Sequence, residues 1–471
     1  MRTHLKLCLL TSLLLLLSLP CAAQQDPVKR IDLYVRTEMA RQKIPGLSLA
    51  IVRNGKISTL RSYGFANLEH QVPVTPETIF QSGSIGKQFT AAALMILVQD
   101  GKISLDDRVT KYFPDAPATW QSITIRQLLT HTSGMQDFPP DLDLRRDYTE
   151  EEYLASFKKA PLSFAPGSRW DYSNAGYATL GILIRKVTGM FYGDFLKARI
   201  FEPLGMTTAR IISEADIVPH RAAGYRLVAG EIKNQQWVSP STNSTADGSL
   251  YFSILDLVKW DAALYSESPL RQSTLAQIFA PTRLSDGGTK GYGFGWFTDT
   301  MHNRRIMFHG GAWQGFKSFI LRFPDDKLSI IFFANSWELR DFKFARGLAA
   351  LFYPEFTLPE IKTIEDDDPK TRAAVRRVLL QLSKGELNAD AFTADGRSEM
   401  TVDRVKKIRE NLESLSLPVA VISLSELIER RDENNLRVFR YLLTDIGQTL
   451  ECTVKVTKDD KIAAIELTRK G

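Results

Sequence analysis

The chain has 471 residues, of which 44% are hydrophobic and 10% aromatic. This composition excludes a disordered or fibrous protein, and the length predicts two or three globular units. The formal net charge is only +6, with 60 basic residues scattered among 54 acidic ones, so we expect no nucleic-acid partner.

The first 23 residues have the pattern of a secretory signal peptide. Arg2 and Lys6 precede the apolar run Leu7–Leu19, and small residues follow as far as Ala23. The run is shorter than the roughly 20 residues that a membrane-spanning helix needs, and no later stretch reaches that length. We therefore expect residues 1–23 to be removed and the protein to be exported, either to the periplasm or as a secreted protein.

The cysteines fit an exported protein without disulfides. Cleavage after Ala23 removes Cys8 and Cys21 and leaves Cys452 alone, so no internal disulfide is expected. Lipidation at Cys21 is the alternative to plain cleavage, but Pro20 stands where a small, flexible residue is expected. An ordinary hydrophobic core must therefore stabilise the mature protein.

Residues 24–355 are predicted to form one domain. An amphipathic helix is expected at 26–43, and Asn54-Gly55 is the strongest short signal for a β-hairpin. A mostly helical stretch follows from 86 to 264. Strands are then expected at 292–298, 305–309, 316–323 and 328–334, and a closing helix at 339–351. Because tight turns join the strands, we expect an α/β (α+β) fold, with an antiparallel sheet flanked by the N- and C-terminal helices and a mostly helical second lobe.

A small α+β accessory domain is predicted at 369–471, after a linker at 356–368. Asp368 and Pro369 are typical of a helix start. Helices are expected at 370–383 and 402–415, followed by four strands, of which 450–456 alternates apolar and polar residues. Nothing in this module points to catalysis, so we expect it to mediate self-association, partner contact or substrate access.

Ser84 and Lys87 form a Ser-x-x-Lys pattern where a turn enters an Ala- and Leu-rich helix. Residues three apart share one face of a helix, so the lysine lies on the side of the hydroxyl. A lysine takes the hydroxyl proton only when it is neutral, and burial at a helix N-terminus lowers its pKa. The same pattern at Ser156 and Lys159 lies in a charged, exposed segment, so the pattern alone is weak evidence.

Two further segments carry groups that suit acyl chemistry. Tyr172 can relay a proton and Asn174 can orient a carbonyl, and the common alternative is a core tyrosine followed by an asparagine at a helix N-cap. The segment His309-Gly310-Gly311-Ala312 ends a predicted strand. Its glycines let a substrate approach the backbone, and the alternative is a simple bend in the strand.

Together and in this order, these segments resemble the serine β-lactamase and penicillin-binding protein superfamily. The resemblance is to its class C-like branch, which also contains esterases and D-stereospecific peptidases, and it runs from about Gly46 to Phe352. Three more segments are typical of that branch: Leu128–Gly134, Phe164–Gly167 and Glu202–Met206. In that family the loop that holds His131, within the first of them, is structural.

The resemblance implies a role for each matching residue. Ser84 would be the acylated nucleophile, Lys87 its proton partner, and Tyr172 a general base or proton relay. Asn174 would hold the substrate. The backbone N–H groups of Ser84 and Ala312 would form the oxyanion hole. The implied reaction is acyl transfer to water in two steps.

The chain departs from the family where many relatives have lysine followed by threonine or serine, because it has His309 and Gly310. A neutral histidine and a glycine supply neither the charge nor the hydroxyl that would hold a substrate carboxylate. This favours an esterase or a peptidase over efficient penicillin hydrolysis. Trp313 and Trp296 would line an apolar acyl pocket or, equally, pack against the sheet.

The leading hypothesis is therefore an exported serine hydrolase that forms an acyl-enzyme at Ser84 with an ester or amide, as an esterase or D-amino-acid peptidase does. The alternatives are a β-lactamase proper and a non-catalytic, penicillin-binding-like envelope protein. The expected partner is a small-molecule or peptide acyl substrate. We expect no cofactor and no metal, because the sequence has no metal-ligand motif.

Overall fold

The computed structural model describes residues 26–138, 142–357, 362–364, 366–413, 415, 426–444 and 449–470. The predicted signal peptide and Cys21 lie outside these residues. Within the described ranges, no helix is both long enough and apolar enough to cross a membrane.

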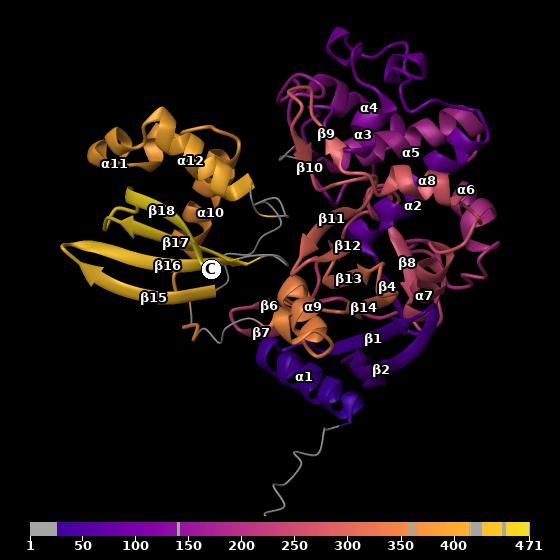
Figure 1. Cartoon of the computed structure of the whole chain (residues 1–471), viewed down its shortest axis with the longest axis horizontal. Helices are drawn as coiled ribbons and strands as arrows, with labels where there is room; N and C mark the ends of the chain where they lie inside the picture. The colour runs from indigo at the N-terminus through magenta and orange to yellow at the C-terminus, as the bar shows by residue number, and fades with distance from the viewer. Residues whose placement is uncertain are drawn as a thin grey trace, which may run out of the picture.

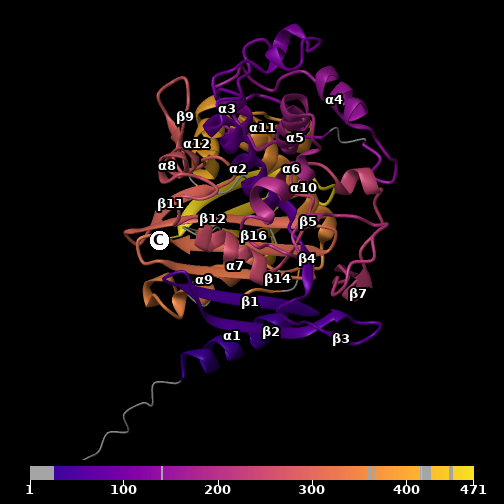
Figure 2. The ribbon, with the colours of Figure 1, turned by 90° about the vertical axis from the view of Figure 1, so that its right-hand side faces the viewer.

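An antiparallel sheet forms the centre of the larger unit, as predicted, and it has seven strands, of which β3 was not predicted. Its strands lie in the order β11-β12-β13-β14-β1-β2-β3, which can be followed in Figures 1 and 2 together. In that order their bounds are Phe297–Met301, Arg304–Trp313, Phe316–Phe323, Leu328–Ala334, Gly46–Arg53, Lys56–Asn67 and Val72–Pro73. The predicted hairpin is confirmed: β1 and β2 meet at Asn54 and Gly55, whose φ angles of 50° and 71° suit a type I′ turn.

Helices α1 (Pro27–Gln42) and α9 (Asp341–Ala350) cover one face of this sheet, which confirms the predicted arrangement. Val35 of α1 and Phe344 of α9 are fully buried there. The ring centroid of Phe344 lies 4.8 Å from that of Phe332 on β14. The two helices therefore cover this face of the sheet, and the helical lobe packs against the opposite face.

The second lobe is mostly helical, as predicted. Its helices are α2 (Gly86–Gln99), α3 (Ile125–Leu129), α4 (Glu150–Lys159), α5 (Asn174–Thr188), α6 (Tyr192–Leu196), α7 (Ile254–Ala263) and α8 (Gln272–Ile278). The same part of the sequence also forms short strands that were not predicted: β4 (Ile79–Gln81), β5 (Arg210–Ile211), β6 (Tyr225–Val228), β7 (Glu231–Asn234), β8 (Leu250–Ser253), β9 (Thr282–Arg283) and β10 (Thr289–Lys290). The β6–β7 hairpin lies beside α9 and α1 and not among the helices of the lobe (Figure 1). Strands of two to four residues are too short for a detectable alternation of apolar and polar side chains.

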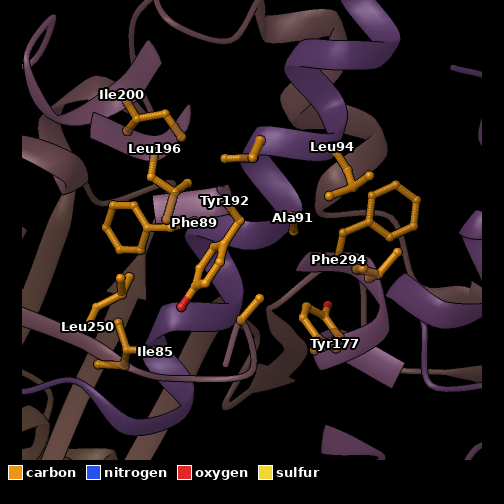
Figure 3. Close-up of a cluster of buried hydrophobic side chains, with 14 of the residues drawn as sticks. Ile85, Phe89, Ala91, Leu94, Tyr177, Tyr192, Leu196, Ile200, Leu250 and Phe294 are labelled. Carbon is orange, nitrogen blue, oxygen red and sulfur yellow. The ribbon is translucent and has the colours of Figure 1, made fainter. Parts of the chain in front are cut away.

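Helix α2 is buried on nearly all sides between the sheet and the lobe. Its Phe89 and Leu94 belong to one continuous cluster with side chains of α5, α6 and β8 (Figure 3). A helix that is apolar all round must be enclosed by other elements. Because α2 is enclosed in this way, the residues at its N-terminus are held in fixed positions.

The strand predicted at 292–298 is wrong. The structure has a loop from 292 to 296, and β11 begins only at Phe297. Gly295 has a φ of +74°, and a Cβ there would lie 2.8 Å from the backbone oxygen of Lys87. Phe294 joins the cluster around α2 (Figure 3). The segment thus wraps closely around α2, and the glycines that permit this contact prevent a regular strand.

The C-terminal module pairs helices with a four-stranded antiparallel sheet, as predicted (Figure 1). Its elements are α10 (Pro369–Ser383), α11 (Ala394–Glu399), α12 (Val402–Glu413), β15 (Glu426–Glu433), β16 (Leu436–Thr444), β17 (Thr449–Val456) and β18 (Ile462–Lys470). Asp368 caps α10 by accepting a hydrogen bond from the Thr371 N–H at 3.0 Å. Cys452 is a free, buried thiol on the apolar face of β17. Helix α11 was not predicted.

Candidate active site

Ser84 lies in a 3-10 turn, η1 (Gly83–Ile85), that leads directly into α2. Gly83 adopts a φ of +51°, and a Cβ there would lie 2.4 Å from the backbone nitrogen of Ala312. Only glycine allows the turn to approach β12 this closely. The turn therefore presents Ser84 beside strand β12, with the serine itself partly exposed.

Lys87 is fully buried, and its Nζ lies 3.1 Å from Oγ of Ser84. Nζ also donates hydrogen bonds, each 2.6 Å long, to Oδ1 of Asn174 and to the backbone oxygen of Asp247. Both of those partners only accept, so they hold two hydrogens of the amine. In the neutral amine the lone pair is then left toward Ser84. The geometry suits removal of a proton from the serine hydroxyl.

Burial lowers the pKa of Lys87 from 10.5 to about 8, and the charges of Asp247 and Asp137 oppose this shift in part. The aromatic faces of Tyr172 and Tyr177 lie 4.9 and 5.5 Å from Nζ. These rings help to keep water from the amine. A lysine in such surroundings is partly neutral near physiological pH, as a proton acceptor must be.

Asn174 does not cap α5, so the alternative interpretation of this residue is wrong. Ser173 is the N-cap, since its Oγ accepts from the Gly176 N–H at 3.1 Å. The Asn174 side chain is thereby free to contact Lys87. Its Nδ2 donates to Oδ2 of Asp137 at 3.1 Å, and its backbone N–H donates to Oδ1 at 3.0 Å. Asp137 thus holds the side-chain amide of Asn174 so that the amide oxygen faces Lys87.

Tyr172 lies on the extended segment before α5 and lines the cleft beside Ser84. Burial raises its pKa well above 10, and a hydrogen bond with Ser84 offsets only part of this shift. The phenol is therefore protonated at neutral pH, whereas the lysine is the group that can be deprotonated. This contrast favours the lysine as the base and the tyrosine as a proton relay.

The His309–Ala312 segment does not end a strand, contrary to the sequence-based interpretation. Strand β12 continues to Trp313, and each residue of the segment pairs with β13 on one side. Its other side faces η1. A Cβ on Gly311 would lie 2.0 Å from the Ser82 oxygen and 3.0 Å from the Ser84 nitrogen. The absence of a side chain therefore brings the backbone of β12 against the nucleophile turn.

His309 is buried and neutral. Its Nδ1 lies 2.7 Å from the Gly310 oxygen, and its Nε2 lies 3.3 Å from the Tyr292 hydroxyl. Burial and the nearby charge of Lys87 lower its pKa to about 3. Because the carbonyl oxygen only accepts, Nδ1 carries the proton and Nε2 accepts from the tyrosine. This side chain supplies no positive charge to a substrate.

A chain of hydrogen bonds links β12 to the Tyr172 loop. The Tyr292 hydroxyl lies 3.1 Å from Nε2 of His131, and Nδ1 of His131 accepts from the Ser173 N–H at 3.1 Å. His131 therefore donates to Tyr292, which donates to His309. Burial also lowers the pKa of His131 well below 6.5. These hydrogen bonds between uncharged side chains hold β12 and the Tyr172 loop in fixed positions relative to each other.

A cleft of about 1130 Å³ contains these groups. It is lined by Ser84, Asp137, Tyr172, Asn174, His309, Gly310, Gly311 and Ala312, among others. Trp296 is buried in the core, and neither it nor Trp313 lines the cleft, so the acyl-pocket interpretation of these tryptophans is not supported. Ser156 lies on α4, away from the site, and its hydroxyl donates to a backbone oxygen of its own helix.

Sequence reasoning missed Asp137, Asp247 and Tyr292. Each acts through a contact with a residue far away in the chain, and none belongs to a recognisable pattern. The glycines around Tyr292 were a local signal for close packing, but the sequence did not identify what packs there. Only the folded chain brings these residues to Lys87, Asn174 and His309.

A family model described as Beta-lactamase matches residues 31–353, which is more than half of the chain. The chain belongs to the Beta-lactamase family. The family membership confirms the resemblance found in the sequence, as well as the predicted fold class. As a member, the chain is a serine hydrolase, and the matched segment includes every residue of the candidate site.

Individual relatives agree with this placement in the Beta-lactamase family. The chain is 29% identical over 358 residues to Penicillin-binding protein 4* of Bacillus subtilis, covering 72% of this chain and 79% of that protein. It is 26% identical to the D-amino acid amidase from Ochrobactrum anthropi, with a TM-score of 0.60 and coverages of 70% and 97%. An octameric penicillin-binding protein homologue from Pyrococcus abyssi shares the fold, at 23% identity and a TM-score of 0.63. That likeness covers 94% of this chain and 98% of the other.

Proposed function

We propose that the protein is an exported hydrolase that cleaves an ester or amide through an acyl-enzyme at Ser84. The observation that carries the proposal is the position of Lys87. Two acceptors hold the amine so that its lone pair meets the serine hydroxyl, and its pKa is lowered to about 8. A lysine with only a structural role would need neither a lowered pKa nor a lone pair directed at a serine hydroxyl.

In the proposed mechanism Lys87 takes the proton of Ser84 while Oγ attacks the acyl carbon. The backbone N–H groups of Ser84 and Ala312, brought together by Gly83 and Gly311, stabilise the developing oxyanion. The proton passes through the Tyr172 hydroxyl to the leaving group as its bond to the acyl carbon breaks. Water then attacks the acyl-enzyme while Lys87 takes its proton. As the bond between the acyl carbon and Oγ breaks, Lys87 passes that proton to Oγ, and the acid and the free serine are released.

The neutral His309 supports the proposed substrate class. A site without a fixed cation on β12 depends little on a carboxylate next to the scissile bond, which favours simple esters and amides over penicillins. The similarity to a D-amino acid amidase supports amides of D-amino acids as the first class to test. A β-lactamase proper and a non-catalytic binding protein remain the alternatives that the following experiment separates.

Incubation with an activated short-chain ester, a D-amino acid amide and a penicillin should leave an acyl adduct on residues 24–471, detectable by intact mass. Ser84→Ala should abolish both the adduct and turnover. Ser156→Ala, which changes the other Ser-x-x-Lys serine, should behave as the unmodified protein does. A fast-decaying penicillin adduct would favour a β-lactamase. The absence of any adduct on folded protein would favour a binding protein.

The rate should depend on pH through Lys87. We expect kcat/KM for a neutral ester to rise between pH 6 and 9 with a midpoint near 8, because only the neutral amine accepts the serine proton. The lowered pKa also means that the unfolded chain binds more protons between pH 8 and 10.5, so the free energy of unfolding should rise across this range. Lys87→Met should remove this stability increase. A flat rate profile from pH 6 to 9 would contradict the assignment of the base.

A further inference from the structure

The segment 246–248, just before β8, lies along η1 and the first turn of α2. Its three backbone oxygens accept hydrogen bonds of 2.7, 2.6 and 2.9 Å, which the side chains of Thr90, Lys87 and Ser82 donate in that order. Three consecutive carbonyl groups are thus tied to the N-terminal end of the helix. Asp247, in the middle of the segment, is therefore held beside the proposed base.

The carboxylate of Asp247 lies near the amine of Lys87. The backbone oxygen of the same aspartate is 2.6 Å from Nζ, so covalent geometry keeps the carboxylate within about 8 Å of the amine. Its Oδ1 is buried and has no hydrogen-bond partner among the described residues. Burying a carboxylate oxygen without a partner costs free energy, and a purely structural role of this side chain does not explain that cost.

The other titratable groups around Lys87 come from α5 and the segment before it, from the loop after α3, and from β12. They are Tyr172, Tyr177, His131, Asp137 and His309. Burial raises the pKa of the two tyrosines and lowers the pKa of the two histidines, so these four side chains are uncharged near neutral pH. Asp247 also acts on two buried phenols, those of Tyr153 on α4 and Tyr192 on α6, and burial raises the pKa of both. Among the described residues, the charges that act on Lys87 are therefore the carboxylates of Asp137 and Asp247.

These two carboxylates differ in what else they do. The oxygens of Asp137 accept from the backbone and the side chain of Asn174 at 3.0 and 3.1 Å, so a substitution there would release the amide as well as remove a charge. Oδ1 of Asp247 holds no described group in place. A substitution of Asp247 therefore removes a charge beside Lys87 without moving Asn174.

We propose that Asp247 is a positioning residue whose carboxylate stabilises the ammonium that Lys87 becomes when it takes the serine proton. This inference rests on the proposed function and names the group that sets the strength of its base. As Oγ of Ser84 bonds to the acyl carbon, its proton moves to Nζ and a positive charge forms there. A negative charge at this distance in a buried site favours that charge.

The same charge keeps Lys87 from becoming too weak a base. Burial lowers the pKa of Lys87, and the charge of Asp247 opposes this shift more than that of Asp137 does. A lysine with a higher pKa would be protonated at neutral pH, whereas one with a lower pKa would take the serine proton less readily. Asp247 thus determines both the pH at which the base becomes available and the rate that it supports.

Asp247→Asn tests this role, because it keeps the shape of the side chain and removes its charge. The midpoint of the pH–rate profile for a neutral ester should fall by about one pH unit, from near 8 to near 7. The rate at high pH should fall by about threefold, because the base is weaker. The variant should therefore be faster than the unmodified chain at pH 6 and slower at pH 9. A purely structural defect would lower the rate at every pH and leave the midpoint unchanged.

A second readout does not depend on turnover. In the unmodified chain the free energy of unfolding should rise between pH 8 and 10.5, and in Asp247→Asn this rise should begin near pH 7. The pKa of Lys87 falls further in the folded chain but keeps its ordinary value in the unfolded chain, so the range in which the unfolded chain binds more protons extends downward. Asp247→Ala, which removes the same charge with a different shape, should shift both readouts equally.

Glu214→Gln is the matched control. Glu214 is exposed and accepts a hydrogen bond at 3.2 Å from Asn243, four residues before Asp247. The substitution removes one negative charge near the same segment and should leave both readouts as in the unmodified chain. Unchanged midpoints in both Asp247 variants, in a chain whose Ser84 is acylated, would overturn the inference but not the proposed function. A shifted stability profile in a chain whose Ser84 is never acylated would support the pairing of Asp247 with Lys87 and overturn the proposed function.

Discussion

Replacing Lys87 with methionine should lower kcat/KM for the best ester or amide by about a thousandfold. The variant loses the amine that accepts the serine proton but retains a side chain of similar length in the same buried space. Its melting temperature should be equal or higher, because burial of an amine that ionises costs free energy that a thioether does not. Steady-state kinetics and thermal unfolding, measured on the same preparation, check both parts.

The control for this variant is Lys159→Met, which removes the lysine of the other Ser-x-x-Lys pattern on the surface helix α4. It should change neither the rate nor the melting temperature. A Lys87→Met protein with at least a tenth of the original rate would show that another group removes the proton. A large drop in melting temperature would show that the lysine has a structural role as well.

Replacing Gly311 with alanine should lower kcat by about a hundredfold or more and also reduce stability. The new Cβ would lie 2.0 Å from the Ser82 oxygen and 3.0 Å from the Ser84 nitrogen, both of them backbone atoms. Strand β12 must then move away from η1. That movement separates the amides of Ser84 and Ala312, which together are proposed to bind the oxyanion.

Gly310→Ala is the matched control, since it adds the same methyl group one residue earlier. Its Cβ would lie 3.1 Å from the Phe319 ring and 3.3 Å from a carboxylate oxygen of Asp341. Side chains of this kind can shift by a few tenths of an ångström. The loss of rate should therefore be at least tenfold smaller than for Gly311→Ala. Similar losses in the two variants would contradict the close approach of β12 to the serine as the cause.

The elements that depend on local sequence were predictable. The hairpin follows from Asn54-Gly55, and α10 follows from Asp368 and Pro369, because turn and cap residues act on neighbouring backbone groups. Ser84 and Lys87 could be placed on one face of α2 for the same reason, since three residues of helix bring their side chains together.

Errors arose where contacts distant in sequence overrode the local pattern. The segment 292–298 has the composition of a strand, but residues 292–296 form a loop because Gly295 packs on the backbone of α2. For Asn174 it was the alternative interpretation, a helix cap, that failed, because Ser173 takes that position and the Asn174 amide contacts Lys87. Both segments contact α2, which lies far away in the chain, although the choice of Ser173 as the cap is local.

The sequence by itself determined the fold class, the family and the candidate residues Ser84, Lys87 and Tyr172, because each depends on a short pattern of residues. The tertiary structure alone decided how those residues are tuned and enclosed. The acceptors that orient Lys87 and the neutral chain through Tyr292 both join segments far apart in the chain. Such contacts leave no periodic pattern in the sequence, because the residues between two segments determine neither how far apart the segments lie nor what they contact.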